Sequence, residues 1–434
     1  MGWTNYSRSF LSIFLVTISL CCADDPFDRV LQLSRIRHKM ADSINRMPDY
    51  TCLATNTRAS RGRKDKHFKA VDTLRFEIAH VGATELWAWP GAKRFQDTPL
   101  TSMIQNGAIS LGDFALYART VFVEANGRLK FQGPEQLDGR ATLRWNYEIP
   151  AFLSGWQIGF GHHSAVAAAA GSFWADPETL DILRLEIRTA DLPFDFPLTE
   201  VVNTIDYART RIGETLVQLP QSAVLMLRRN TGELQRNSTE FSHCKQFSGE
   251  AAISFEPKAE AGSIVESAKK TEEVSLSSGL RLRLKLGSSI DSANSVVGEL
   301  VEGTLENDVS RSGFLLVPKG AHITGRIRRM EKHAEGPYYI VGIELDDVDY
   351  PGHHARFFGS LLELDPQPPG FQWFLGSERI EEGGRFKNGG GITTVTVQKG
   401  LQLGNAPGVG TFFMLGPAFR ISKGTVMVWD SQSL

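Results

Sequence analysis

The sequence predicts a mainly β protein (α+β) with two domains. Apolar and polar residues alternate through many short segments, which is the pattern of antiparallel strands with one face buried. Glycine and proline separate these segments, as they do in β-barrels and sandwiches. The chain has 434 residues, which is more than a single domain normally contains.

The amino terminus has the features of a signal peptide. Arg8 is the one charged residue before an apolar run of about 13 residues. A helix that crosses a membrane needs about 20 residues, so the sequence favours cleavage after Ala23 and export. The alternative is a lipid anchor on Cys21 or Cys22, which Leu20 disfavours because such a signal has a small residue before its cysteine.

The overall charge gives no sign of a nucleic-acid partner. The chain contains 47 basic and 49 acidic residues, for a formal net charge of -2. A near-neutral protein creates no general field that would attract the phosphate backbone. We therefore predict no nucleic-acid binding.

An amphipathic helix is expected over residues 24–48. It opens with two acids and a proline, which are typical of a first helical turn. Its apolar residues recur at helical spacing and predict one stripe that packs on the rest of the domain: Phe27, Val30, Leu31, Ile36, Met40, Ile44 and Met47. The basic stretch 58–69 that follows is expected to be a solvated loop between strands.

Strands and one further helix are expected in the rest of the first domain. Strict alternation predicts strands at 73–78, 142–149 and 183–188, with the pair Asp176-Pro177 marking the turn before the third. Residues 110–123 are expected to form a helix, since Ser110 and Asp113 make a capping box.

The composition changes after residue 255. Residues 257–273 contain much Ala, Glu, Lys and Ser and are expected to be a linker. Alternation resumes at 280–286, and further strands are expected at 296–305, 313–317, 321–329, 338–348, 354–364, 393–397 and 410–429. The glycine-rich stretch 381–391 is expected to be a loop. We therefore place the parts of the chain at 1–23 (signal peptide), 24–256 (first domain), 257–274 (linker) and 275–434 (second domain).

No motif in the sequence indicates catalysis or a metal. The histidine pairs at 162–163 and 353–354 are adjacent, and neighbours in a strand point to opposite faces. The acidic residues at 346–349 lack the turn glycine and distal glutamate of a calcium loop. We predict no catalytic residue, no cofactor and no metal site, so the protein is not expected to be an enzyme. A hydrolase with a site assembled from distant residues is the alternative.

Two cysteines follow the leader, Cys52 and Cys244. An even number of cysteines in an exported protein predicts a disulfide between them. Two buried free thiols are the alternative.

Aromatic residues are frequent in the first domain. A curved sheet lined with such side chains would form an apolar cavity for a lipid or a similar ligand, and a well-packed core is the alternative. The candidates for the lining are Phe76, Trp87, Trp89, Phe131, Trp145, Tyr147, Trp156, Phe173 and Trp174.

The first domain resembles the periplasmic lipoprotein-carrier (LolA/LolB-like) superfamily. The resemblance covers about residues 24–255 and is carried by the amphipathic helix, by YTC at 50–52 and by SFWADPETLDILRLE at 172–186. It implies an unclosed antiparallel β half-barrel with plugging helices, whose apolar concave face holds acyl chains. The chain is similar as well to uncharacterised bacterial envelope proteins.

The second domain resembles the β-barrel domain of TrbI-type conjugal transfer scaffolds. The resemblance is carried by GLRLRLKLGSSIDSANSVVGELVEGTLENDV at 279–309 and GFLLVPKGAHITGRI at 313–327. It implies a second, smaller β-barrel-like domain that mediates contacts. This chain departs from the family in having no uncleaved inner-membrane helix and no long proline-rich spacer, so a role in a secretion channel does not carry over.

Together these observations predict an exported cell-envelope protein. The first domain is expected to bind a hydrophobic ligand, either a lipid or a lipoprotein acyl chain, and the second to contact an envelope protein. The periplasm is the expected location, and association with the outer membrane is left open. The alternative is a non-enzymatic scaffold or assembly component without a small ligand.

Overall fold

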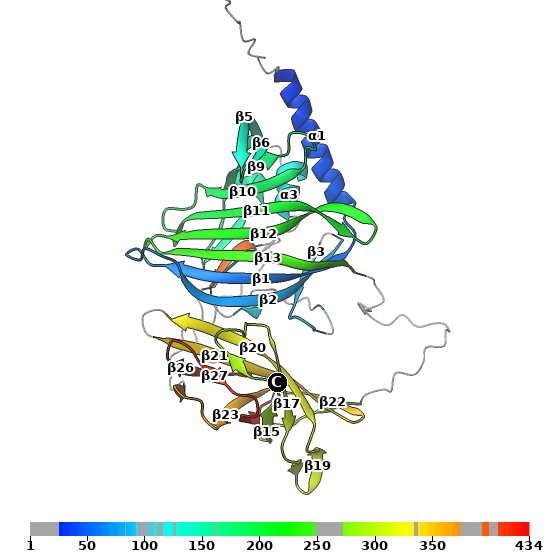
Figure 1. The fold of residues 1–434 in the computed structure, drawn as a ribbon, viewed down its shortest axis with the longest axis vertical. Helices are drawn as coiled ribbons and strands as arrows, with labels where there is room; N and C mark the ends of the chain where they lie inside the picture. Colours follow the sequence, from blue (N-terminus) through cyan, green and yellow to red (C-terminus); the bar gives the residue numbers. More distant parts are fainter. Residues whose placement is uncertain are drawn as a thin grey trace, which may run out of the picture.

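The computed structural model shows two β units that lie against each other (Figure 1). It describes residues 26–82, 84–92, 95, 103–104, 107–110, 116–124, 127–160, 163–247, 272–333, 337–373, 393–398 and 407–433. The expected linker and glycine-rich loop therefore fall outside the described residues, apart from the last two residues of 257–273, which begin a strand. Within the described residues the chain is mainly β, as predicted.

The first unit is built on one curled antiparallel sheet. Its end strands, β3 and β5, do not pair with each other within the described residues, so the sheet forms the predicted unclosed half-barrel. Its ten strands lie in the order β3 (Thr84–Ala88), β2 (Lys69–Val81), β1 (Tyr50–Arg61), β13 (Leu234–Gln246), β12 (Thr215–Arg229), β11 (Leu198–Ile212), β10 (Ile182–Ala190), β9 (Ala168–Ala175), β6 (Arg140–Ile149) and β5 (Arg128–Leu137).

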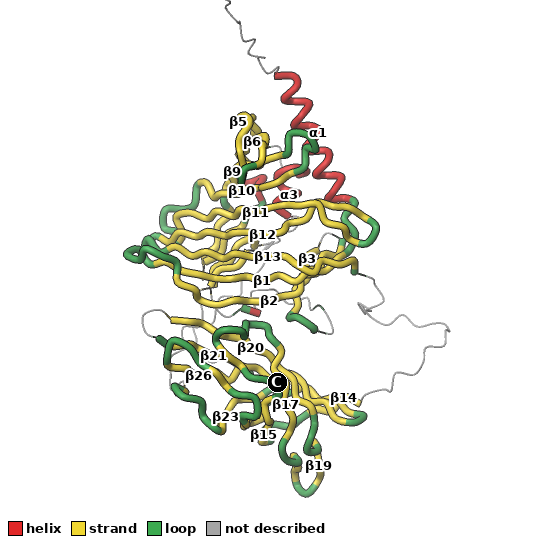
Figure 2. Tube along the Cα trace, viewed as in Figure 1, coloured by secondary structure: helices red, strands yellow, loops and turns green. Residues whose placement is uncertain are grey.

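Helices lie on one face of this sheet (Figure 2). The expected first helix is confirmed as α1 (Pro26–Asn45), with a proline at its first position and Asp28 in its first turn. The proline lacks an amide hydrogen that would have no partner there, and the acid complements the helix dipole. Shorter helical turns are α3 (Leu116–Arg119), the π-helical η1 (Thr120–Glu124) and α4 (Ala151–Ser154).

A second, small sheet packs with the helices inside the half-barrel. It consists of β4 (Gly107–Ser110), β25 (Thr393–Gln398), β7 (Gln157–Phe160) and β8 (His163–Val166), in that order. The predicted helix at 110–123 is wrong at its start, because Ser110 ends a strand instead of capping a helix. β4 pairs with β25, more than 280 residues later in the chain, and this long-range pairing overrides the local helix signal.

The second unit contains another ten-stranded sheet. Its main path is β14 (Glu272–Ser275), β22 (His353–Arg356), β21 (Tyr338–Tyr350), β20 (His322–His333), β17 (Leu300–Leu305), β15 (Arg281–Leu286), β28 (Val426–Ser431) and β23 (Gly359–Asp365), with β26 (Val409–Leu415) and β24 (Phe371–Trp373) attached through β21. Two small ribbons complete it, β16 (Ile290–Asp291) with β27 (Arg420–Ile421), and β18 (Val309–Arg311) with β19 (Phe314–Val317).

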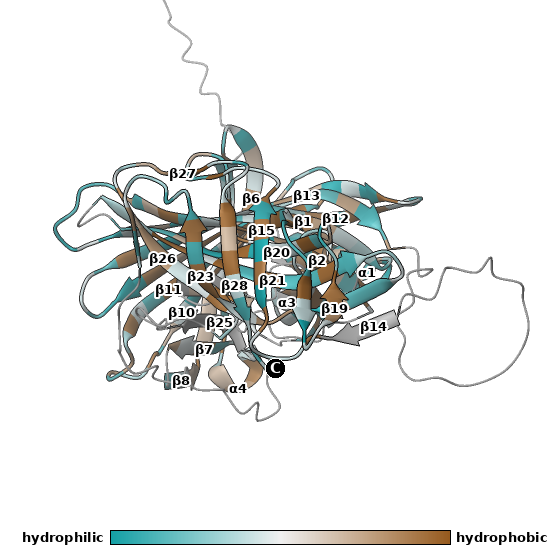
Figure 3. Ribbon diagram, turned by 90° about the horizontal axis from the view of Figure 1, so that it is seen from below, coloured by the Kyte–Doolittle hydropathy of each residue, from teal (hydrophilic) through white to brown (hydrophobic). Residues whose placement is uncertain are grey.

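The apolar residues that alternate in the sequence are the buried residues of the strands. In β15, Leu282, Leu284 and Leu286 are buried, whereas Arg281 and Lys285 are exposed. Figure 3 shows the same mixture of apolar and polar residues along the strands. Each unit therefore builds its own apolar core, as the two expected domains require.

The two units meet where β2 faces β20 and the segment before β17. The backbone of Val297 accepts a hydrogen bond from the Arg75 amide at 2.9 Å and donates one to the carbonyl of Thr73 at 3.0 Å. Leu74 and Phe76 belong to the core of the second unit although they lie on a strand of the first. The edge of the half-barrel is thus covered by the other unit.

The basic stretch expected to be a solvated loop is largely strand. β1 continues to Arg61 and β2 begins at Lys69, so the connection is short. Arg58 is only 5% exposed and its guanidinium binds the carboxylate of Asp72 through two nitrogens, with an Nε to Oδ1 distance of 2.6 Å. Strand alternation turns Arg58 inward, where Asp72 on the paired strand compensates its charge.

The acidic residues at 346–349 are partly buried on a strand. Asp346 lies on β21, where burial and the nearby Glu344 raise its pKa to about 6, despite the opposing effect of Arg326. The ionised carboxylate therefore opposes folding above pH 6. The cost decreases as the pH falls from about 6 to about 4 and is absent only well below pH 4, where the carboxyl is protonated in both the folded and unfolded states.

Replacing Asp346 with asparagine is expected to increase the free energy of unfolding at pH 7.5 by about 3 kcal/mol, since one pKa unit corresponds to about 1.4 kcal/mol. The gain should fall below about 1 kcal/mol at pH 4. Urea denaturation at both pH values measures it, with Glu363→Gln, at an exposed position of β23, as a control that changes little. A less stable Asp346→Asn protein at pH 7.5 would contradict this account.

Candidate functional site

The candidate site is the concave face of the half-barrel, which α1 and the small sheet cover. Ile36, Met40 and Ile44 project from α1 into the core and are at most 4% exposed. They meet inward-facing side chains of the half-barrel strands together with Ile158 of β7. The predicted concave face exists, and the described part of the protein shows it covered by the chain's own segments.

Four of the nine predicted lining residues lie in this covered core, namely Trp145, Tyr147, Trp156 and Phe173. Trp145 stacks on Phe173 with ring centroids 6.2 Å apart and planes 8° apart. Phe131, half-buried at the rim, contacts Trp145 at 4.9 Å. These residues form one aromatic cluster beneath the helical cover.

Tyr147 follows Trp145 by two residues on β6 and has its hydroxyl bonded inside the sheet. Its Oη donates a hydrogen bond to the carbonyl of Glu186 at 2.8 Å. The neighbouring Gly171 makes this possible, because a Cβ there would lie 1.9 Å from the same carbonyl oxygen. Burial raises the pKa of Tyr147 well above its usual value, so the phenol stays neutral.

The other predicted lining residues lie elsewhere. Phe76 and Trp89 stack at 5.2 Å at the junction with the second unit, and Trp87 packs between the two cores. Trp174 lies outside the covered core, with the guanidinium of Arg144 5.3 Å from its ring. Since Phe173 and Trp174 are neighbours in one strand, they point to opposite faces. A role in lining a ligand stays a prediction for the whole set.

Buried amides on the concave face were missed by the sequence reasoning. Asn203 is fully buried and its Nδ2 donates to the hydroxyl of Ser110 at 3.2 Å. Asn237 donates to the carbonyl of Ala108 at 2.6 Å. Both amides thereby fix β4 on the face of the half-barrel. The signal was available, since Asn203 stands between Val201 and Ile205 at an inward position of an alternating strand.

A few polar contacts attach α1 to the half-barrel. Lys39 Nζ lies 2.7 Å from the carboxylate of Asp181, and it also donates to the carbonyl of Thr179. Burial alone would favour neutral Asp181, but hydrogen bonds from Arg209 and Lys39 hold its pKa below the usual value. Near the end of the helix, the backbone amide of Gln218 donates to the Ser43 hydroxyl at 3.0 Å.

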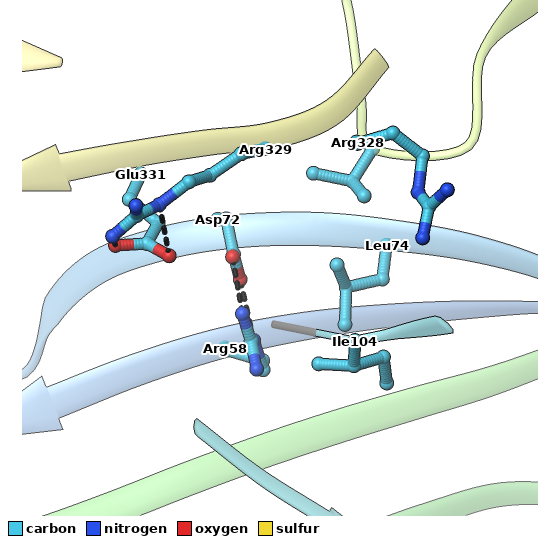
Figure 4. Close-up of a pocket in the computed structure, with 8 residues that line it drawn as sticks. Arg58, Asp72, Leu74, Ile104, Arg328, Arg329 and Glu331 are labelled. Carbon is cyan, nitrogen blue, oxygen red and sulfur yellow. Dashed lines mark hydrogen bonds and ion pairs between the residues drawn. The ribbon is translucent and has the colours of Figure 1, made fainter. Parts of the chain in front are cut away.

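A small cavity lies between the two units, where two buried ion pairs face each other (Figure 4). Its volume is about 10 Å³, which is room for about one water molecule, and its lining includes Arg58 with Asp72 and Arg329 with Glu331. Burial opposes ionisation of Glu331, but the nearby His333 and the guanidinium of Arg329, which donates to both carboxylate oxygens at 2.9 Å, lower its pKa to about 2. None of the nine predicted aromatic residues lines this cavity.

The predicted disulfide is confirmed. Cys52 and Cys244 are bonded between the adjacent strands β1 and β13, with Cα atoms 4.1 Å apart. Within the described ranges, no three or more His, Cys, Asp or Glu side chains gather to hold a metal ion. His163 lies on β8 against Phe196, and His162 falls outside the described residues.

Among the described residues, no helix combines the length and the apolar character that a membrane crossing requires. No family model matches the chain, and no curated protein matches it in sequence.

Solved structures give similarities at low sequence identity. A DUF1329 family protein from Desulfovibrio piger is 11% identical, over 51% of this chain and 95% of its own, with a TM-score of 0.29. A putative outer membrane lipoprotein-sorting protein domain from Vibrio parahaemolyticus is 10% identical, over 49% and 90%, with a TM-score of 0.28. A LolA superfamily protein from Nitrosomonas europaea is 10% identical, over 50% and 94%, with a TM-score of 0.25. The resemblance of the second domain to TrbI-type scaffolds finds no support in these comparisons.

Proposed function

We propose that this protein is an exported carrier in the cell envelope that binds one apolar chain, such as the acyl chain of a lipid or lipoprotein. The observation behind the proposal is that α1 covers the concave face with only three deeply buried side chains, Ile36, Met40 and Ile44. The helix is the cover of the site, and the ligand takes its place on the aromatic cluster around Trp145 and Phe173. The second unit serves for contacts with an envelope partner.

The free energy lost when α1 leaves the concave face is similar in size to the free energy gained when an acyl chain replaces it. Lifting α1 exposes three side chains at about 1.5 to 3 kcal/mol each, or about 5 to 9 kcal/mol together. A saturated chain gains about 0.8 kcal/mol for each methylene buried, so about twelve methylenes supply about 10 kcal/mol. An acyl chain of ordinary length therefore offsets the loss of the cover, whereas a chain of about six methylenes does not.

A non-enzymatic scaffold without a small ligand is the second candidate. It is favoured by the dense packing of the concave face, where Phe122 of η1 contacts Phe173 at 5.0 Å between ring centroids and Trp145 and Phe173 are at most 3% exposed. In this case the aromatic cluster is a permanent core and both units act as contact surfaces.

Native mass spectrometry of protein purified from the envelope without detergent separates the two functions. A carrier is expected to bring one lipid with it. After delipidation, it should bind a fluorescent fatty acid that is displaced by a chain of about 16 carbons and not by one of about 8 carbons, in line with the methylene count above. Empty protomers that bind neither probe would leave the scaffold as the function.

The role of α1 as the cover is tested by Lys39→Ala. The substitution removes the contact with Asp181, which weakens the attachment of the helix by up to about 1 kcal/mol. The association rate of the fluorescent fatty acid, measured by stopped flow, is expected to rise about threefold to fivefold. Arg35→Ala, at an exposed position on the same helix, is the control and should leave the rate unchanged. Equal rates in all three proteins would show that another segment covers the site.

A further inference from the structure

The first turns of α1 carry exposed apolar side chains. The sequence predicted one stripe that packs along the whole helix, but Phe27, Val30 and Leu31 are 72%, 68% and 41% exposed. Figure 1 shows this end of α1 extending past the sheet. The spacing of three and four residues places the three side chains on one face of the helix. They form an apolar ridge at the end of the molecule far from the second unit.

We propose that this ridge docks on an anionic lipid surface. The basic residues of α1 that are available to such a surface are Arg29 and the exposed Arg35, with Asp28 as the acid of the first turn, because Lys39 and Arg37 are bound to the first unit. A basic amphipathic helix with aromatic and aliphatic residues on its other face is the composition that lies in a membrane interface. Basic side chains near the surface are attracted to anionic headgroups.

The position of the ridge in the chain also points to a membrane. α1 begins at Pro26, shortly after the apolar run that ends at residue 22. This run is the predicted signal peptide, which enters the membrane during export. The ridge therefore lies close to the membrane at that stage. The outer side of the rim is basic as well, since Arg29 lies 4.2 Å from the ring of Phe131 and Lys130 is exposed on the adjoining β5. Basic side chains thus lie both on α1 and on the strand next to its first turns.

The size of the ridge favours lipid over a protein partner. A stable protein interface buries about 800 Å² on each side, far more than three side chains offer. A bilayer accepts a narrow ridge, because acyl chains need no matching shape. This inference goes beyond the carrier function and does not depend on a bound ligand.

Vesicle flotation of the exported full-length protein tests the proposal. All proteins carry Cys21→Ser and Cys22→Ser, so that no acyl anchor contributes. Vesicles of phosphatidylglycerol with phosphatidylethanolamine are expected to carry the parent protein upward, and pure phosphatidylcholine vesicles to carry much less. In Phe27→Ser/Val30→Ser/Leu31→Ser, affinity should fall about tenfold for each side chain replaced.

The matched control is Phe314→Ser/Leu315→Ser on β19, where both side chains are also exposed. It should float like the parent protein. Circular dichroism of the triple variant should be unchanged, because the three side chains lie outside the core. Equal flotation of the triple variant and the parent, no flotation of the parent on anionic vesicles, or a loss in the β19 variant alone would each overturn the proposal.

Discussion

Replacing the disulfide with Cys52→Ala/Cys244→Ala is expected to lower the free energy of unfolding by about 5 kcal/mol. The bond joins residues that are 192 positions apart, so its loss frees a very long loop in the unfolded chain. The conformational entropy of an open loop grows with the logarithm of its length, which makes this cross-link worth more than a short one. Guanidinium denaturation followed by tryptophan fluorescence measures the difference.

The reduced parent protein is the control for this variant. Reductant should bring the parent to the stability of the double variant and should leave the variant unchanged. If removal of both cysteines costs less than about 1 kcal/mol, the cross-link is not a main contributor to stability and the unfolded chain keeps structure around strands β1 and β13.

Replacing Arg58 with alanine is expected to cost about 3 to 5 kcal/mol, because it leaves the carboxylate of Asp72 buried without its partner. Arg58 is 5% and Asp72 9% exposed, so solvent cannot compensate the remaining charge. Removing both charges with Arg58→Leu/Asp72→Leu should restore most of the stability, since apolar residues of similar size avoid desolvating two ions.

Arg75→Ala, at an exposed position of the same strand β2 as Asp72, is the matched control and should change stability by less than about 0.5 kcal/mol. Thermal unfolding and urea denaturation report the three variants. If the double leucine variant is as unstable as Arg58→Ala, the ion pair is required for the contact between the two units, and the reasoning from desolvation is wrong.

Much of the fold was predictable because its signals are local. The alternation around Leu282 and Leu284 needs no knowledge of the partner strand, and the stripe of α1 is visible within twenty residues. The disulfide was predictable because the sequence contains only two cysteines after residue 23. The strand β4 was not, since its hydrogen bonds go to Thr393–Gln398 and no local pattern indicates such a distant partner.

The candidate site was predictable in kind and only partly in its residues. Aromatic content identified Trp145 and Phe173, which lie together in the core. Trp174 was included among the predicted lining residues because it is aromatic, although its neighbour Phe173 in the same strand already faced inward. Phe76 was included for the same reason, and the second unit covers it. The side of a sheet that another unit covers depends on contacts between distant segments. The amino-acid composition does not indicate these contacts.

The position of β25 has a consequence for biosynthesis. The middle strand of the small sheet comes from Thr393–Gln398, between β4 and β7 of the first unit. A ribosome releases residues 24–256 long before it makes this strand, so the part of the protein that is synthesised first is completed last. Until then β4 and β7 keep open hydrogen-bonding edges, which is the condition under which nascent chains associate with chaperones or with each other.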